Sequence, residues 1–285
     1  MPPKKRTANI NGLDIAYWDE GQGLPLVFIH GNSMSKQIFA PQFDSPLTEK
    51  YRLIAIDLPG HGESSRLPSE GTYTVELFTS VIIGCWQRLE CRGGILIGHS
   101  LGGHLILQSA PALGGEMGGM MIFGTPPLSL PPRMEEAFLP NPAPLALAFR
   151  EEVSQQELDL RDQACFSTAK GKPPAFFQDE YKRTDPKLRV HLARCVGALA
   201  FHDETEIIKT LTCPLAILHG QADALINKQY LENLTIPSLW QGVIHVLAEA
   251  SHTPQWETPV LFNQLVDDFA QTISTSALNP LLTAP

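Results

Sequence analysis

The chain has 285 residues, a formal net charge of -9 at pH 7 and 43% hydrophobic residues. This length suits one large α/β domain with an insertion, or two small domains, and the composition is that of a globular chain. The negative charge argues against nucleic acid and anionic membrane surfaces as partners. Since no apolar run approaches the roughly 18 residues that a transmembrane helix needs, we also expect no membrane span.

The cysteines bear on the compartment in which the chain works. They are five in number and none forms a CxxC pair: Cys85, Cys91, Cys165, Cys195 and Cys213. An odd count without paired spacing favours buried thiols in a reducing environment over disulfides or a zinc site. We therefore expect a cytoplasmic protein.

The first half of the chain alternates apolar runs with a helical pattern. An Asn-Gly pair between alternating segments predicts a β-hairpin over residues 7–18. Residues 75–89 have the periodicity of a helix. Buried strands are expected at residues 24–30, 53–57, 95–99 and 120–123. Apolar strands separated by helices predict a mostly parallel sheet with helices on both faces.

This alternation stops between about residues 126 and 205. Proline-rich turns there lead into helical stretches near 151–166 and 185–200. We interpret the segment as a helical cap inserted into the sheet topology, because sheet-type periodicity returns after it.

The last part of the chain completes the sheet. Strands are expected at residues 214–220 and 243–247, and an amphipathic helix near residues 259–269 closes the fold. The remaining segment is small, polar and proline-containing, which favours a flexible tail. The expected units are a core of residues 1–125 and 206–273, a cap of residues 126–205 and a tail of residues 274–285.

One short segment suggests the chemistry. An apolar strand pattern ends at Gly98-x-Ser100-x-Gly102, and a helical pattern follows. This is the spacing of a nucleophile elbow, in which a serine lies on a strained strand-to-helix turn. The neighbouring glycines are needed because a Cβ at either position would crowd the turn. The elbow also places the hydroxyl at the positive N-terminus of a helix.

A serine hydroxyl needs a positioned base and a carboxylate that orients that base. Asp223 follows one late strand and His252 follows the next, at the strand ends where open α/β sheets build their sites. The order serine, acid, histidine is that of the α/β-hydrolases. The sequence therefore predicts a triad of Ser100, Asp223 and His252.

The alkoxide formed by attack on a carbonyl needs preorganised N–H donors. The backbone of Leu101, directly after the serine, and that of Asn32, after an earlier strand, are the candidates. Whether the Asn32 side chain adds a third donor stays open. The other histidines fit structural roles: His30 and His61 lie beside glycine turns, and His245 falls inside a strand.

The chain resembles the α/β-hydrolase superfamily over about residues 24–269. The marks of that resemblance are the Ser100 elbow and the Asp-x-x-Gly-His-Gly-x-Ser segment at 57–64. Further segments make it similar to the metal-independent N-acyl-homoserine lactonases, which are quorum-quenching enzymes. These segments are His30–Ser33 with Ile38–Gln42, Gly124–Pro127, Leu239–Gly242 and Ser251–Glu257.

The resemblance implies a site and a cofactor requirement. The family's triad falls on Ser100, Asp223 and His252, and its oxyanion hole on Asn32 and Leu101. The family has glutamate where this chain has Asp223, and the cap matches poorly beyond its first residues. Metal-dependent lactonases carry an H-x-H-x-D-H motif that this sequence lacks, so no metal and no other cofactor is expected.

We accordingly expect an enzyme, a serine hydrolase that opens an N-acyl-homoserine lactone, acting as a monomer or homodimer on a small-molecule ester or lactone. A general carboxylesterase and a receptor-like binding protein of the same fold are the alternatives. Expected substrate contacts are Gly31, His99, Phe138, Phe149 and Trp240. Apolar cap residues that are candidates to hold an acyl chain are Phe138, Leu139, Leu145, Leu147, Phe149, Phe166, Phe176 and Phe177.

Overall fold

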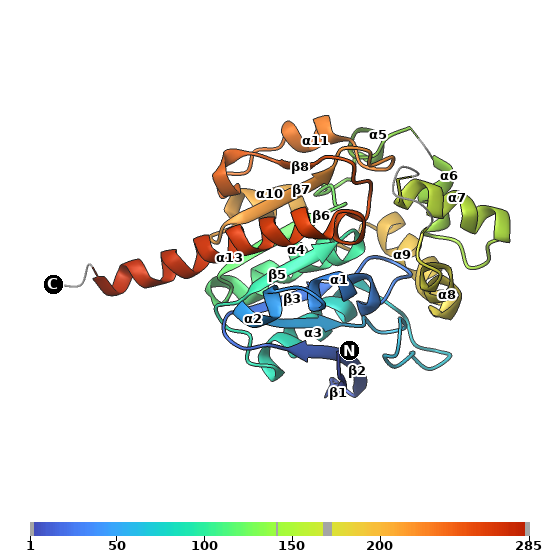
Figure 1. The fold of residues 1–285 in the computed structure, drawn as a ribbon. Coiled ribbons are helices and arrows are strands. Elements are labelled where there is room, and N and C mark those ends of the chain that lie inside the picture. Colours follow the sequence, from blue (N-terminus) through green and yellow to red (C-terminus); the bar gives the residue numbers. More distant parts are fainter. Residues whose placement is uncertain (1–2, 141, 168–172, 283–285) are drawn as a thin grey trace.

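An eight-stranded sheet runs through the computed structural model, which describes residues 3–140, 142–167 and 173–282 (Figure 1). The strands lie in the order β1-β2-β4-β3-β5-β6-β7-β8. Their bounds are β1 (Lys5–Ile10), β2 (Leu13–Glu20), β3 (Pro25–Ile29), β4 (Arg52–Ile56), β5 (Ile95–His99), β6 (Gly119–Phe123), β7 (Leu215–Gly220) and β8 (His245–Leu247). Only β1 with β2, and β2 with β4, pair antiparallel. The mostly parallel sheet predicted from the sequence is confirmed.

The predicted hairpin forms the antiparallel edge of this sheet. Strands β1 and β2 pair in register from Lys5 with Trp18 to Ile10 with Leu13. The connecting residues Asn11 and Gly12 both have positive φ, 53° and 84°. Two left-handed residues in succession match the twist of the flanking strands, which explains why Asn-Gly occupies this turn.

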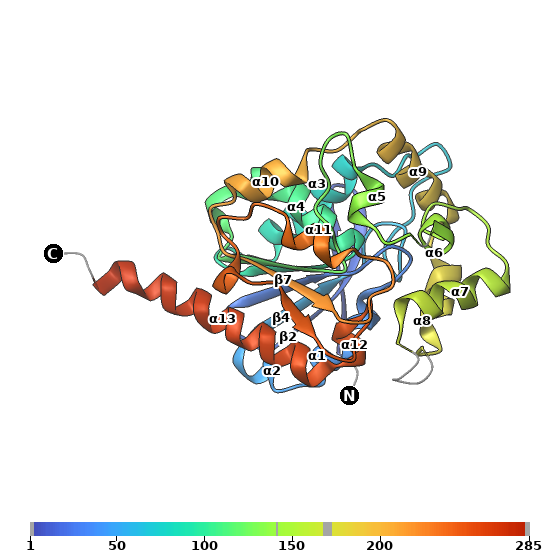
Figure 2. The same cartoon turned by 90° about the horizontal axis from the view of Figure 1, so that it is seen from above.

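Helices cover both faces of the sheet (Figure 2). One face carries α3 (Val75–Arg88), α4 (Leu101–Leu113), α10 (Glu204–Thr210) and α11 (Lys228–Glu232). The other carries α1 (Ala40–Phe43), α2 (Leu47–Lys50), α12 (Pro254–Glu257) and α13 (Pro259–Leu282).

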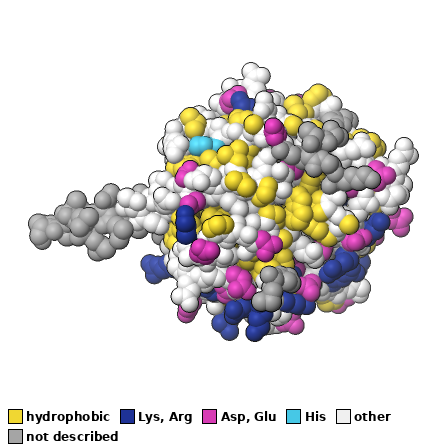
Figure 3. All heavy atoms as spheres, in the orientation of Figure 1, with side chains coloured by type: hydrophobic (Ala, Val, Ile, Leu, Met, Phe, Trp, Pro, Cys, Tyr) yellow, Lys and Arg dark blue, Asp and Glu magenta, His cyan; other side chains and the backbone are white. Residues whose placement is uncertain are grey.

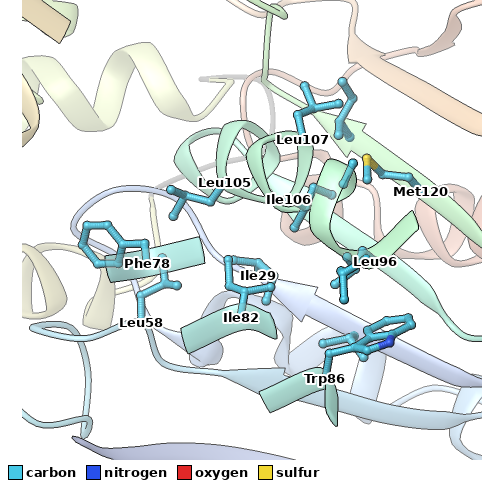
Figure 4. Packing of buried hydrophobic residues seen from close by; sticks show 14 of the residues in the cluster. Ile29, Leu58, Phe78, Ile82, Trp86, Leu96, Leu105, Ile106, Leu107 and Met120 are labelled. Carbon is cyan, nitrogen blue, oxygen red and sulfur yellow. The ribbon is translucent and has the colours of Figure 1, made fainter. Parts of the chain in front are cut away.

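Two apolar clusters fill the spaces between the sheet and these layers. Successive residues of a strand enter opposite clusters, as the period of a strand requires: Val27 packs on the α3 side and Phe28 on the α13 side. Figure 4 shows Trp86 of α3 close to the sheet residue Leu96, and Phe78 of the same helix beside Leu58. Burial of both faces explains why the central strands are apolar throughout.

The segment expected to form the cap is helical and lies at one end of the sheet (Figures 1 and 2). Its helices are α5 (Met134–Ala137), α6 (Pro142–Leu147), α7 (Gln155–Cys165), α8 (Phe176–Arg183) and α9 (Pro186–Gly197). Helix α7 begins at a capping box in which Ser154 and Glu157 exchange hydrogen bonds. Helix α9 begins after Asp185, whose side chain accepts from the backbone N–H of Lys187. These caps place both helix starts later than the helical patterns at 151 and 185.

The C-terminal end differs from the expectation. Helix α13 does not stop near residue 269 but continues to Leu282, so the segment expected to be a loose tail is helical up to that residue. Residues 283–285 lie outside the described residues. Figure 1 shows α13 crossing one face of the sheet and extending beyond it. Within the described part of the chain, no helix combines the length and the apolar character needed to cross a membrane.

The exposed surface carries both the charged and the apolar residues of the chain. The face seen in Figure 3 carries hydrophobic side chains among charged side chains of both signs. The most exposed large hydrophobic residue is Val260, at the start of α13, and isolated residues of this kind are common on protein surfaces.

All five cysteines are free and buried. Burial raises the pKa of the Cys85 and Cys91 thiols to about 12, which makes them poor nucleophiles.

Candidate active site

Ser100 lies on the tight turn between β5 and α4. Its backbone has φ 51° and ψ -119°, a strained conformation of the kind that the Gly-x-Ser-x-Gly spacing predicts. The N–H of Ser100 donates to the Phe123 carbonyl at 2.9 Å, and the Thr125 hydroxyl donates to the Ser100 carbonyl at 2.9 Å. The end of β6 therefore holds the strained turn in place.

The two glycines of the motif are required by close backbone approaches. A Cβ at position 98 would come 2.6 Å from the Cα of Gly103. A Cβ at position 102 would come 2.2 Å from the Ile29 carbonyl oxygen at the end of β3. Both distances are shorter than any real Cβ contact. The Ser100 turn is therefore tightly packed between the start of α4 and the end of β3.

Asp223 and His252 come together beside this turn. The His252 Nδ1 lies 2.9 Å from Asp223 Oδ2, and both side chains are almost fully buried. The backbone N–H groups of Leu225 and Ile226 donate to the other carboxylate oxygen at 2.8 and 3.1 Å. Burial acts to raise the pKa of Asp223, but the His252 charge and these hydrogen bonds outweigh it and lower the pKa. An ionised Asp223 fixes the proton on Nδ1 and leaves Nε2 of His252 to act as a base.

A cavity of about 180 Å³ adjoins these residues. Ser100, His252, Asn32 and Leu101 all contribute to its wall. The rest of the wall is mainly apolar, and much of it comes from the helical segment between residues 134 and 196. The predicted nucleophile, the predicted base and a mainly apolar cavity therefore share one site, which suits an acyl ester.

The predicted oxyanion donors stand at this cavity. Among the described residues, no acceptor receives the backbone N–H of Asn32 or of Leu101. Unpaired backbone donors at a catalytic cavity are what an oxyanion hole requires. The Asn32 side chain has other partners: its Nδ2 donates to the Ala148 carbonyl at 2.7 Å, and the Ser33 hydroxyl donates to its Oδ1 at 3.0 Å. We therefore infer that this side chain links the oxyanion loop to the helical segment.

Two buried histidines brace the loop that carries Asn32. The His30 Nε2 accepts from the Leu58 N–H at 3.0 Å, and the His61 Nε2 accepts from the Ser33 N–H at 3.1 Å. Burial lowers the pKa of both rings, so they stay neutral and can accept these bonds. The structural roles expected for His30 and His61 are confirmed.

The expected substrate contacts divide into two groups. Phe138 and Phe149 line the cavity, whereas Gly31, His99 and Trp240 do not. His99 is fully buried, with Nε2 2.8 Å from the His252 carbonyl oxygen. A Cβ at Gly31 would come 3.2 Å from the Ser100 Cβ, so this glycine leaves room for the nucleophile.

Trp240 requires a correction, because it packs far from this chemistry. Its ring lies 4.5 Å from that of His245 and 5.2 Å from that of Phe269 in α13, and its Nε1 donates to the Thr272 hydroxyl. These contacts belong to the core on the α13 face. Of the other apolar residues proposed to hold an acyl chain, Leu145 lines the cavity, and Leu139, Leu147, Phe166, Phe176 and Phe177 do not.

Four polar residues of the cavity wall were not singled out from the sequence: His104, Gln108, Arg161 and Glu204. A signal existed for His104, which lies in the first turn of the helix that begins directly after Ser100. No local pattern marks Arg161 or Glu204. Arg161 is buried with its guanidinium 3.9 Å from the Phe177 ring centroid, and burial lowers its pKa.

Solved structures show the same architecture. A variant of the N-acyl homoserine lactonase AidH, solved with N-hexanoyl homoserine lactone, is 28% identical to this chain and matches with a TM-score of 0.89. The match covers 95% of this chain and 99% of that one. The esterase RhEst1 from Rhodococcus sp. ECU1013 is 25% identical over 96% of this chain and all of its own, with a TM-score of 0.76.

Sequence relatives lead to the same family. The 2-hydroxymuconate semialdehyde hydrolase of Pseudomonas sp. (strain CF600) is 26% identical over 94% of each chain. A non-heme chloroperoxidase, CPO-A1 of Kitasatospora aureofaciens, is 27% identical over 76% of this chain and 80% of its own. The model of the alpha/beta hydrolase family matches residues 26–265. The chain therefore belongs to the α/β-hydrolase family and is an ester-cleaving hydrolase.

Proposed function

We propose that the protein is a serine hydrolase that opens N-acyl-homoserine lactones to N-acyl-homoserines without a cofactor. The observation that carries this proposal is the likeness to the AidH structures over nearly the whole of both chains. The mainly apolar cavity beside Ser100 supports it, because such a space suits an acyl chain. We also propose that residues 126–205 act as the cap over this cavity.

We propose one step for each triad residue. His252 Nε2 takes the Ser100 proton as the hydroxyl oxygen attacks the lactone carbonyl, and the Asn32 and Leu101 N–H groups receive the oxyanion. The ring C–O bond then breaks, and His252 returns the proton to the leaving alcohol. Because that alcohol is part of the acyl group, it stays attached to the acyl-enzyme. His252 next deprotonates a water, which attacks the carbonyl and releases one hydroxy acid and free Ser100.

A general carboxylesterase is the second candidate. The match to the esterase RhEst1 over 96% of this chain and all of its own favours it. An aspartate at position 223 and the divergent cap also separate this chain from the lactonases that it resembles. The two candidates share the triad and differ in what the cavity admits.

Mass spectrometry of ring opening separates these candidates. Acyl-homoserine lactones of several chain lengths are compared with p-nitrophenyl esters, beside an enzyme-free blank and the Ser100→Ala variant. We expect the lactones to gain one water faster than the esters are cleaved, and Ser100→Ala to lose at least about 10⁴-fold in kcat. Turnover of esters alone would assign the carboxylesterase function instead. Failure of Ser100 to react with a fluorophosphonate, together with tight lactone binding, would indicate a receptor-like protein.

A further inference from the structure

A second histidine–carboxylate pair lies in the wall of the catalytic cavity. The His104 Nδ1 is 2.8 Å from Glu204 Oε2, and the two side chains are 20% and 3% exposed. Both residues line the cavity together with Ser100. His104 lies in the first turn of α4, the helix that begins directly after Ser100. The mechanism proposed above makes no use of this pair.

The surroundings of Glu204 decide which ring nitrogen carries the proton. The Leu128 N–H donates to Glu204 Oε2 at 2.8 Å, and the Gln108 side-chain amide donates to Oε1 at 3.1 Å. The carboxylate is therefore surrounded by donors and acts as an acceptor, so the hydrogen bond to His104 has its proton on Nδ1. With the Nδ1 proton directed at Glu204, Nε2 is the ring atom that can accept a hydrogen bond in the imidazole form.

The Nε2 atom of His104 is available to a ligand. No residue in the described ranges forms a hydrogen bond to it. It is also not one of the fully buried polar atoms that lack a hydrogen-bond partner, so it is accessible. An imidazole that only braced Glu204 would need Nδ1 alone. A histidine fixed in one tautomer by a carboxylate, with its other nitrogen free at a substrate cavity, is suited to recognise a hydrogen-bond donor.

We propose that His104, positioned by Glu204, determines specificity by accepting the amide N–H of the N-acyl lactone. This inference rests on the proposed lactonase function. In that substrate the nitrogen is bonded to the carbon next to the reacting carbonyl, which places it about 2.5 Å from the carbonyl carbon. A hydrogen bond of about 3 Å then spans to an acceptor about 5–6 Å from the reacting carbon. His104 lies in the first turn of the helix that begins directly after Ser100, and both residues line the same cavity.

The test compares two lactones that differ only at this position. One is N-hexanoyl-homoserine lactone, and the other is α-hexanoyloxy-γ-butyrolactone, in which oxygen replaces the N–H. Mass spectrometry distinguishes ring opening from cleavage of the added ester. We expect the wild-type enzyme to favour the amide in kcat/KM by about tenfold or more, because the ester oxygen would face an acceptor with no proton between them. In His104→Phe, which keeps a ring in the wall, the ratio should fall towards one, mainly through KM.

Two further variants make the result specific. Leu145→Val changes the cavity wall without touching the histidine pair, so it should keep the wild-type ratio. Glu204→Gln keeps the shape of the side chain but removes the carboxylate that fixes the tautomer of His104. It should therefore lower the amide-to-ester ratio of kcat/KM in part. This variant decides the question if His104→Phe does not fold, as judged by its circular dichroism and thermal melt.

The outcomes separate the two proposals. If the wild type opens both lactones with equal efficiency, or if His104→Phe slows both by the same factor, His104 only braces Glu204 and the inference is wrong while the lactonase function stands. If Glu204→Gln keeps the full ratio, the positioning role of Glu204 is wrong. If the wild type cleaves p-nitrophenyl esters and opens neither lactone, the proposed function fails and this inference fails with it.

Discussion

Gly124 is the residue whose substitution would most directly move the catalytic base. It follows β6 with φ +60°, lines the cavity, and lies against the His252 ring. A Cβ at this position would come 2.8 Å from the ring Cε1, 3.1 Å from Nδ1 and 3.3 Å from Nε2. We therefore predict that Gly124→Ala displaces the imidazole from Ser100.

The size of the effect follows from these distances. Ordinary contact begins at 3.4 Å, so the ring must move by about 0.6 Å to relieve the closest contact. The ring has little freedom, because Nδ1 is bonded to Asp223 and the His99 ring lies 5.1 Å away on another side. Because misplacement of a reacting group by about 1 Å can cost about 10²-fold, we expect kcat to fall by about ten- to a hundredfold. The left-handed backbone adds about 1–2 kcal/mol of destabilisation.

The matched control is Gly93→Ala. Gly93 also has positive φ, +79°, but a Cβ there would meet nothing within 4 Å. Both variants therefore carry the backbone strain, and only Gly124→Ala carries the contact with His252. The assay measures kcat with p-nitrophenyl acetate and stability by urea unfolding. If Gly124→Ala and Gly93→Ala have the same kcat within twofold, the argument from ring displacement is refuted.

Three other substitutions test the predicted triad acid, the side chain of Asn32 and the ion-paired carboxylate of Glu63. Asp223→Asn removes the acceptor that fixes the imidazole tautomer, so kcat should fall by about 10⁴-fold with little change in KM; a loss below tenfold would contradict the triad. Asn32→Ala keeps the backbone donor and loses the bond to the helical segment, so steady-state kcat should fall less than tenfold while stability drops by about 1 kcal/mol. Partial burial raises the pKa of Glu63, but hydrogen bonds from Lys36 and Lys5 outweigh it and lower the pKa to about 2. A lowered pKa means that this carboxylate stabilises the fold above pH 4.5 and loses its contribution as the pH falls towards 2. Glu63→Gln should therefore lower the midpoint of unfolding by its full amount at pH 7 and by a smaller amount below pH 4.5. A decrease that is the same at every pH would contradict the assignment.

The sequence was sufficient for those parts of the site that local patterns encode. The Ser100 turn needs glycines at two fixed offsets, and that requirement is visible in five residues. Asp223 and His252 are far apart in the chain, but each follows a strand of a parallel sheet, and the carboxyl ends of such strands meet at one edge. This explains why a one-dimensional order of residues predicted a pair that lies 2.9 Å apart in the structure.

The sequence was insufficient where tertiary packing decides the outcome. Trp240 lies in a short irregular segment without periodicity, so nothing local indicates that it packs on α13 instead of the cavity. The composition of residues 274–282 favoured a tail, yet α13 continues through them, because adding residues to an existing helix costs far less than starting one. Arg161 and Glu204 reach the cavity from helices whose placement no sequence pattern specifies.

The hydrogen bonds that hold the triad residues themselves come from the sheet side of the molecule. The neighbours of His252 also bond to the helical segment, because the Ser251 and Thr253 hydroxyls donate to the Ala164 and Cys165 carbonyls of α7. Ser100 is held by the end of β6, Asp223 by backbone donors directly after it, and the His252 carbonyl by the His99 ring. Much of the cavity wall, in contrast, comes from residues 134–196. Asn32 is the link, since its backbone serves the oxyanion and its side chain holds the Ala148 carbonyl. Substitutions in α6 to α9 should therefore change which acyl group is accepted, seen in KM, before they change the reactivity of Ser100, seen in its rate of labelling by a fluorophosphonate.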